Sequence, residues 1–499
     1  MSLLDKIIKS SLIRTINFIL TAIISFFMMP FVIHSLGNRM YGLWVLIGSF
    51  LSYYGLLDLG ISSAVRRFVS QALGKKNVYE VNMVVNTAVI LFSLIGILVI
   101  LISLIAAWIV PYFTNKVADI NLFRKIILIM GVSTGISFPA RVFNGVLSAN
   151  LRYDISTGIS MITLIIRTAL IVIFLKQGYG VLALAIISAS LNLIQYCSIF
   201  VAVRKLFPWL RFKMSLFYKQ TVRKLFGYSV FSLISNIADY LRFRLDNFVI
   251  GAFLGLSPIT VYAIPIGLLD YFTNFILSSV GFMAPLFSQY EGAGDMKSIR
   301  ARFLDITKVC VLLAVFIGVS LLIYGKVFII RWVGTKFESS YYILCILCIP
   351  SIIALMQNPS IGLLYGISKH KYYAVANNCE GILNLALSLI LVKYYGLYGV
   401  ALGTAIPMLL FKLLIQPVYV CRCINLSVKK YYKTVFFTAI KVIIVLLLYY
   451  CSIKSFLSPS YIKIFSIAIL QTLIFIPIAF FLILDTEQRQ FVKKELRIG

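Results

Sequence analysis

The residues best suited to chemistry lie inside one apolar stretch, residues 225–255. Four charged side chains interrupt this stretch: Asp239, Arg242, Arg244 and Asp246. The stretch is long enough to cross a bilayer, because about 20 residues suffice. Charges at membrane depth are unfavourable and normally face a cavity or a partner helix. We therefore expect this segment to form the polar wall of a transport cavity.

Helical periodicity separates the four charges. At about 100° per residue, Asp239, Arg242 and Asp246 fall on one side of a helix. Arg244 points away from that side. Two interpretations remain open. The trio can pair within the helix, since its spacings are i, i+3 and i, i+4, or the arginines can contact an anionic ligand.

Five further charged residues lie within predicted spans: Asp58, Arg167, Asp270, Glu380 and Lys412. Arg167 is near the middle of its span and has no acidic neighbour at helical spacing, so it needs a partner on another helix, an anion or water. Lys412 could instead extend toward the cytoplasmic surface. Asp58 and Glu380 could be solvated if they lie close to the interface.

Seven of the 46 Lys and Arg residues are assigned to the predicted spans. These cations at depth favour an anionic ligand, and a phosphate or diphosphate suits the planar fork of arginine. We expect one set of residues to bind the ligand's head group: Arg167, Arg242, Arg244 and Lys412. We expect a second set to couple ions or orient the arginines: Asp58, Asp239, Asp246, Asp270 and Glu380.

Several kinds of site are disfavoured. The chain has only two histidines, His34 and His370, and the Cys345-x-x-Cys348 motif has no second cysteine pair. There is no G-x-x-x-x-G-K-[ST] loop, which argues against ATP hydrolysis by that route. We therefore predict no catalytic residues, no metal site and no cofactor, and a protein that is not an enzyme.

The composition is that of a polytopic membrane protein. Of 499 residues, 61% are hydrophobic and only 12% are charged, and the mean hydropathy is +0.99. The net charge of +30 is high. Nucleic-acid binding would concentrate such charge on a soluble domain, which we do not expect here. The preference for positive charge on the cytoplasmic side of membranes explains it better.

We count about 14 transmembrane helices in an all-α chain. The predicted spans are 12–34, 41–63, 83–110, 123–147, 155–175, 181–203, 225–250, 258–285, 304–325, 340–364, 373–392, 398–420, 434–453 and 461–484. With a cytoplasmic N-terminus, 29 Lys and Arg residues fall inside and 10 outside. This asymmetry predicts a multi-pass protein with both termini in the cytoplasm.

The two halves resemble each other at a nearly constant offset in residue number. Gly180 and Gly399 lie in similar contexts, GYGVLALAI and LYGVALGTAI. Gly145 and Gly362 form a second pair at nearly the same offset, and Gly37 and Gly255 form a weaker third. A repeat of six spans keeps both copies in the same orientation, which predicts two parallel six-helix lobes around a central cavity.

This repeat defines the predicted domains. They are an N-terminal lobe, a basic cytoplasmic linker, a C-terminal lobe, and a C-terminal helix pair with a tail: 1–203, 204–224, 225–420 and 421–499. The first copy carries uncharged residues at the positions that correspond to Asp239, Arg242 and Asp246. The charged helix therefore belongs to the second lobe, and we expect asymmetric substrate binding.

Residues 36–77 carry a resemblance to a known family. The matching elements are Gly37, Tyr41-Gly42, Asp58-Leu59-Gly60 and Arg66. They resemble bacterial polysaccharide-biosynthesis transporters, the O-antigen and capsule flippases of the multidrug/oligosaccharidyl-lipid/polysaccharide (MOP) exporter superfamily. NLRYD, GYGVLALAI and LDNFVIGAFLG fit the same pattern. The likeness covers roughly residues 1–420.

The resemblance implies a function and a location. It implies two six-helix bundles that translocate undecaprenyl-diphosphate-linked oligosaccharide to the outer leaflet of the bacterial inner membrane for O-antigen, capsule or exopolysaccharide synthesis. The expected partners are this lipid-linked glycan, the bilayer, and the polymerase and chain-length proteins of the pathway, with no nucleic acid.

Two other functions remain open. One is an ion-coupled small-molecule exporter of the same superfamily, against which the cations at depth argue. The other is a membrane-embedded polymerase or glycosyltransferase, which would require a large external loop that the spans leave no room for.

Overall fold

The computed structural model describes residues 3–109, 117–213, 216–227, 245–280, 283–483 and 489. Throughout these ranges the regular elements are helices, and no strand occurs in them. Eleven helices in the described residues are long and apolar enough to cross a membrane. The prediction of an all-α polytopic membrane protein is confirmed. Asp239, Arg242 and Arg244 lie outside the described residues.

Two of the eleven candidate spans each contain two predicted spans. The first, Ile16–Asp58, is kinked at Gly37, where φ is 75°. The other, Lys371–Cys423, is kinked at Gly396, where φ is 55°. Most of the predicted span 225–250 lies outside the described residues. The number 14 therefore stays a prediction.

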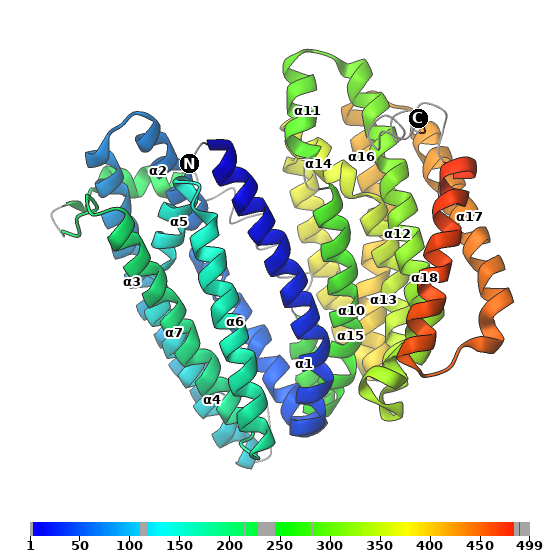
Figure 1. The fold of residues 1–499 in the computed structure, drawn as a ribbon, viewed down its shortest axis with the longest axis horizontal. Coiled ribbons are helices and arrows are strands. Elements are labelled where there is room, and N and C mark those ends of the chain that lie inside the picture. The colour runs from blue at the N-terminus through cyan, green and yellow to red at the C-terminus, as the bar shows by residue number, and fades with distance from the viewer. Residues whose placement is uncertain are drawn as a thin grey trace. The chain divides into compact units, whose positions relative to one another are not determined.

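The chain divides into two compact units. Unit 1 comprises residues 1–240 and 250–260, and unit 2 comprises residues 241–249 and 261–499. The helices before the division are α1 Leu3–Tyr53, η1 Leu56–Asp58, α2 Ile61–Gly74, α3 Val78–Ile109, α4 Val117–Ser137, α5 Arg141–Ala149, α6 Tyr153–Lys176 and α7 Val181–Leu206 (Figure 1).

The later helices have the following bounds: α9 Asp246–Leu254, α10 Leu256–Val280, α11 Met283–Gly292, α12 Met296–Val333, η4 Thr335–Phe337, α13 Ser339–Met356, α14 Asn358–Gly366, α15 Lys371–Leu410, η5 Phe411–Ile415, α16 Gln416–Cys423, α17 Val428–Ile453, η6 Lys454–Phe456, α18 Tyr461–Ile478 and η7 Ala479–Ile483.

Prolines divide two segments that were predicted to be single spans. The predicted span 123–147 is two helices, α4 and α5, with Pro139 in the turn between them. The predicted span 340–364 is α13 and α14, and Pro359 lies in the first turn of the second. A proline cannot donate its backbone nitrogen and disfavours helix in the residue before it. Hydropathy alone does not detect such breaks, because both sides of each are apolar.

Unit 1 is held together by contacts among its long helices. The Phe92 ring on α3 lies 6.0 Å from that of Phe138, and Ser133 on α4 donates to the carbonyl of Ala189 on α7. The basic linker docks onto α3 through the Asn86 side chain. Its Nδ2 donates to the Arg211 carbonyl at 2.7 Å, and its Oδ1 accepts from a linker amide at 2.9 Å. The bond between α4 and α7 is interhelical, and such bonds stabilise packing where lipid provides little hydrophobic drive.

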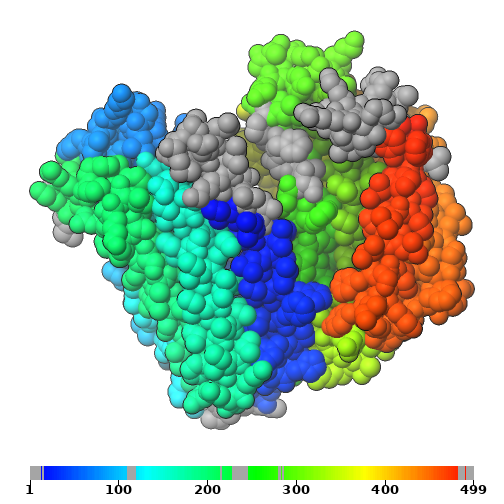
Figure 2. Space-filling view, viewed as in Figure 1, coloured from blue at the N-terminus to red at the C-terminus, as the bar shows by residue number. Residues whose placement is uncertain are grey.

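In unit 2 the last two helices pack against α12. The Phe303 ring of α12 stacks on Tyr431 of α17 at 5.7 Å. Phe316 of α12 stacks on Phe475 of α18 at 4.4 Å. Figure 2 shows α18, in red, on the surface of this unit. The helix pair predicted to stand outside the repeat therefore packs on the C-terminal unit.

The backbone repeats at the offset seen in the sequence. Helix α14 follows α5 at an offset of 217 at both ends. Positive φ values recur at separations of 217 or 218 in four pairs: Gly37 and Gly255, Lys76 and Gly294, Leu151 and Ser368, Gly178 and Gly396. Non-glycine residues rarely adopt this conformation. The recurrence of positive φ at corresponding positions indicates that the two copies have the same local backbone conformation there.

A close backbone approach inside the second copy gives a testable consequence. A Cβ on Gly399 would lie 2.1 Å from the carbonyl oxygen of Leu391, whereas a Cβ on Gly158 of α6 would meet nothing within 4 Å. We expect Gly399→Ala to destabilise the protein by about 1–3 kcal/mol or more, because a backbone atom cannot rotate aside. Gly158→Ala should be neutral or stabilising. Thermal unfolding in detergent measures both, and equal melting temperatures would contradict the expectation.

Candidate functional site

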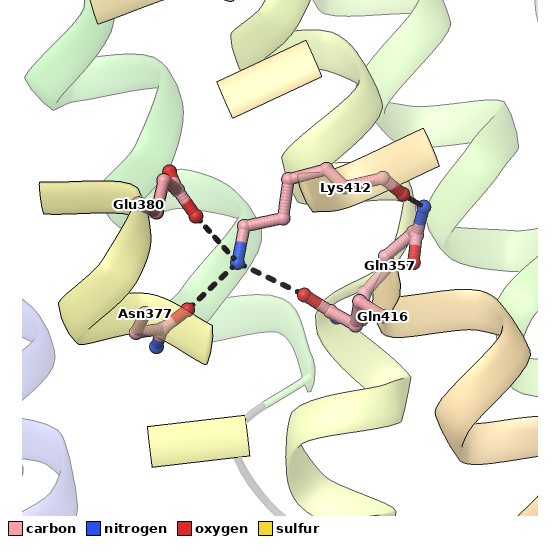
Figure 3. Close-up of polar contacts among 5 residues, drawn as sticks. All are labelled: Gln357, Asn377, Glu380, Lys412 and Gln416. Carbon is pink, nitrogen blue, oxygen red and sulfur yellow. Dashed lines mark hydrogen bonds and ion pairs between the residues drawn. The ribbon is translucent and has the colours of Figure 1, made fainter. Parts of the chain in front are cut away.

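A buried ion pair lies in unit 2. The side chains of Lys412 and Glu380 are buried, with relative exposures of 4% and 2%. The Lys412 Nζ lies 3.5 Å from Glu380 Oε2. It also donates to Asn377 Oδ1 at 3.1 Å and to Gln416 Oε1 at 2.9 Å (Figure 3). Lys412 does not extend to the surface, and Glu380 is not solvated. The structure thus excludes those two alternatives for this pair.

The local backbone positions Lys412 within this cluster. Lys412 lies in the π-helix η5, a widened turn of a kind often found at functional sites. The Gln357 side-chain amide donates to the Lys412 carbonyl. Gln416 Nε2 in turn donates to the Gln357 carbonyl at 3.3 Å. The Lys412 ammonium also lies 5.2 Å from the centre of the Tyr373 ring, within the range of a cation–π contact.

A second polar cluster surrounds Asp246, the first residue of α9. Its carboxylate is buried, with 7% relative exposure. Oδ2 accepts hydrogen bonds from Tyr262 Oη at 2.6 Å and from Thr404 Oγ1 at 2.9 Å. Thr404 Oγ1 also lies 3.3 Å from Asn384 Oδ1. Ser388 Oγ donates to the same amide oxygen at 3.1 Å.

This cluster collects oxygen atoms from α9, α10 and both halves of α15. One carboxylate and several neutral oxygens form a set that could hold a proton or a hard monovalent cation. No group of three or more His, Cys, Asp or Glu residues that could hold a metal ion occurs in the described residues.

One face of α15 connects the two clusters. Asn377, Glu380, Asn384 and Ser388 are all buried. Their spacings of three or four residues place them on one side of the helix. This buried polar face was readable in the sequence as a polar residue every three to four positions. The residues predicted for the site include Glu380 of this face but not Asn377, Asn384 or Ser388.

Asp58, in unit 1, contacts Ser62 of α2 and Arg141 of α5. Its Oδ1 accepts from the Ser62 amide at 3.0 Å, which satisfies a free donor in the first turn of α2. Its Oδ2 accepts from the Ser62 hydroxyl and lies 3.8 Å from Arg141 Nη1. Arg141 lies over the Phe138 ring at 3.9 Å. Asp58, the last residue of η1, therefore satisfies a donor in the first turn of α2, tethers α2 to α5 and orients an arginine.

The other predicted residues lie on separate helices. Arg167 is half-buried on α6, and its Nε has no hydrogen-bond partner within the described ranges. Asp270 lies on α10 with an exposed side chain. Among the predicted site residues, a direct ion pair joins Glu380 and Lys412, and the α15 face links this pair to Asp246.

The fold and these buried charges are those of a polytopic membrane protein. Solved structures with the same fold include two transport proteins. One is the lipid II flippase MurJ in an inward closed conformation, with a TM-score of 0.67 and 20% identity over 95% of this chain and 99% of that chain. The other is an inward-facing multidrug resistance MATE family transporter of the MOP superfamily, with a TM-score of 0.68 and 13% identity over 82% of this chain and 96% of that chain.

The sequence comparison identifies the family. A model of the polysaccharide biosynthesis protein family matches residues 36–342, more than half of the chain. The protein belongs to this family, as the motifs in residues 36–77 predicted. A relative from Shigella flexneri named "Putative O-antigen transporter" is 24% identical over 429 residues, which cover 84% of this chain and 99% of the relative.

Proposed function

We propose that this protein is a flippase for undecaprenyl-diphosphate-linked oligosaccharide repeat units. It moves them from the cytoplasmic to the outer leaflet of the bacterial inner membrane for O-antigen, capsule or exopolysaccharide synthesis. The observation that carries the proposal is a transporter fold in a chain of the polysaccharide biosynthesis family. The names of the Shigella relative and of the lipid II flippase support this substrate class.

We assign the predicted residues to two roles within this proposal. The cations Arg167, Arg242, Arg244 and Lys412 contact the diphosphate and sugar head while the polyprenyl tail stays in lipid. The carboxylate Asp246 couples the cycle to a proton or a monovalent cation, and its buried oxygen-rich surroundings support that role.

The remaining carboxylates and the topology complete the proposal. Asp58 orients Arg141, and Glu380 orients Lys412. Asp239 and Asp270 are further candidates for ion coupling. Both termini lie in the cytoplasm, and the polymerase and chain-length proteins of the pathway are the expected partners.

Deletion and complementation test the function. A strain lacking this gene should accumulate lipid-linked repeat units in the cytoplasmic leaflet and lose surface polysaccharide. Purified protein in liposomes should expose a fluorescent undecaprenyl-diphosphate oligosaccharide to an external glycosidase. Normal surface polysaccharide in the deletion strain, together with no translocation in liposomes, would overturn the proposal.

The MATE-like fold favours one alternative, export of small molecules. Cationic drugs would require carboxylates in the binding cavity, whereas the largest of the cavities described below is lined by cations. Measuring drug susceptibility in the same deletion strain separates the two functions. Increased drug sensitivity with normal polysaccharide would favour the exporter.

A further inference from the structure

A cavity of about 1050 Å³ lies wholly within unit 2, between the start of α15 and the segment formed by η5 and α16. Four cations line it: Lys369, Lys371, Lys412 and Arg422. Three tyrosines line it as well: Tyr372, Tyr373 and Tyr419. Among the described residues that line this cavity, none carries a carboxylate. Its charge and its aromatic rings match a phosphorylated ligand that also carries a sugar.

The rim of this cavity is held by specific contacts. Tyr419 Oη donates to the Lys369 carbonyl at 2.7 Å, and Lys369 Nζ donates to the Cys423 carbonyl at 3.3 Å. The rings of Tyr372 and Tyr419 lie 5.7 Å apart in an edge-to-face arrangement. These contacts join the two walls and preorganise the rim.

The two outer cations remain available. Lys371 and Arg422 are exposed, and no carboxylate of the described residues forms an ion pair with either. Lys412 lies deeper, with its ammonium held by Glu380 and two amides. The cavity thus offers two accessible positive charges at its rim and one compensated charge inside.

The internal repeat provides a second, smaller and less charged copy of this cavity. A smaller cavity of about 560 Å³ occurs in unit 1, and its lining residues are Leu193, Ile194, Cys197, Ser198, Val201, Ala202 and Lys205. Adding 218 to most of these positions gives residues of the unit 2 cavity: Phe411, Lys412, Ile415, Gln416, Tyr419 and Cys423. The same place in each copy is hollow. In the second copy, lysine replaces isoleucine, glutamine replaces serine, tyrosine replaces valine and cysteine replaces lysine.

One arginine occurs at the same position in both copies but makes different contacts in each. Arg204 is the counterpart of Arg422 at the same offset. Arg204 donates to the Leu210 carbonyl at 3.2 Å and lies over the Phe212 ring, so it holds the linker. Arg422 instead lines the cavity. Positive charge near the cytoplasmic surface is common in membrane proteins, but such charge does not by itself gather around a cavity with aromatic walls.

We propose that the unit 2 cavity binds the diphosphate of the lipid-linked glycan at the cytoplasmic surface, before translocation. Lys371 and Arg422 contact the phosphate oxygens, and Tyr372 and Tyr419 contact the adjoining sugar. This assignment rests on the proposed function for the identity of the ligand. The underlying chemistry, a phosphate-bearing head group, is shared by anionic phospholipids, so the experiment must separate the two sources.

Binding to the full-length protein in phosphatidylcholine nanodiscs tests the assignment without requiring translocation. The probes are undecaprenyl diphosphate and, separately, phosphatidylglycerol, each quantified by native mass spectrometry. The variant Lys371→Gln with Arg422→Gln should bind undecaprenyl diphosphate about tenfold more weakly or worse, because two charged hydrogen-bond donors are lost. The single variant Arg422→Lys should bind undecaprenyl diphosphate more tightly than the double variant but more weakly than wild type, because lysine keeps the charge and lacks the planar fork.

The matched control removes the same charge elsewhere. Lys429 and Lys430 are exposed at the start of α17 and do not line the cavity. Lys429→Gln with Lys430→Gln should leave undecaprenyl diphosphate binding unchanged. If both double variants weaken undecaprenyl diphosphate binding equally, the assignment of the binding site to this cavity is wrong. Equal loss of phosphatidylglycerol and undecaprenyl diphosphate in the cavity variant would overturn the diphosphate assignment in favour of bulk lipid.

The two proposals can fail separately. If wild-type protein binds undecaprenyl diphosphate through Lys371 and Arg422 but does not translocate the glycan, the flippase function is wrong and the binding site stands. If translocation is normal and the cavity variant binds as tightly as wild type, the site is wrong and the flippase function stands.

Discussion

Glu380→Ala should remove most of the folded protein from the membrane. The substitution leaves the Lys412 ammonium buried without its counter-charge. Breaking a buried ion pair in this way destabilises proteins by about 3–5 kcal/mol. Membrane levels of a tagged protein, together with its melting temperature in detergent, measure the loss.

The exposed pair Lys326–Glu338 provides a matched control. Its charged atoms are 2.7 Å apart, but both side chains are nearly half exposed. Water screens such pairs, so Glu338→Ala should change stability by about 0–1 kcal/mol. Equal losses from Glu380→Ala and Glu338→Ala would show that burial of the Lys412 pair does not determine stability.

Replacing both partners separates stability from function. Glu380→Met with Lys412→Met removes the stranded charge, and a well-packed apolar pair is often as stable as a buried ionic one. We expect the double variant to recover the membrane level. If it also translocates glycan normally, the pair is purely structural, and Lys412 is not a head-group contact.

Asp246→Asn should abolish most transport while leaving the protein in the membrane. Asparagine keeps an oxygen that can accept hydrogen bonds from Tyr262 and Thr404. It cannot take up and release a proton or offer a full negative charge to a cation. Coupling between sites typically amounts to about 1–3 kcal/mol, so we expect transport to fall by roughly 5–150-fold.

Transport of labelled glycan into liposome lumens, with imposed proton or sodium gradients, provides the readout. Asp305→Asn is the control, because it removes a carboxylate from a partly exposed pair with Arg302. It should leave transport and gradient dependence unchanged. An Asp246→Asn variant that responds to the same gradients as wild type would remove Asp246 from the coupling role.

Much of the architecture was predictable from the sequence. The lengths of the apolar runs indicated an all-helical membrane protein, because backbone polar groups in lipid must be satisfied within the helix. The glycine-containing motifs indicated the repeat, and at one of the three glycine pairs a positive φ restricts the residue choice. The same restriction explains why Gly37 and Gly255 recur in both sequence and backbone.

The helix breaks and the pairings were less accessible. The π-helix at Lys412 widens one turn, and the amides of Gln357 and Gln416 hold it through contacts between positions far apart in the sequence. No helical spacing relates Lys412 to Glu380. Glu380 lies before the Gly396 kink, and Lys412 lies after it. Hydropathy and periodicity describe one helix at a time and therefore do not detect such contacts.

The sequence by itself determined that the chain is an all-helical membrane protein, where most of its apolar segments lie and which family its motifs resemble. The membrane class follows from the transfer of apolar segments between water and lipid, which is local in the chain. Only the tertiary structure decided that Lys412 is buried and compensated, that Asp246 lies among hydroxyl and amide oxygens, and that cations gather around one cavity of the second copy. Those properties depend on which helices pack together, because a buried charge is stable only where other helices supply its partners.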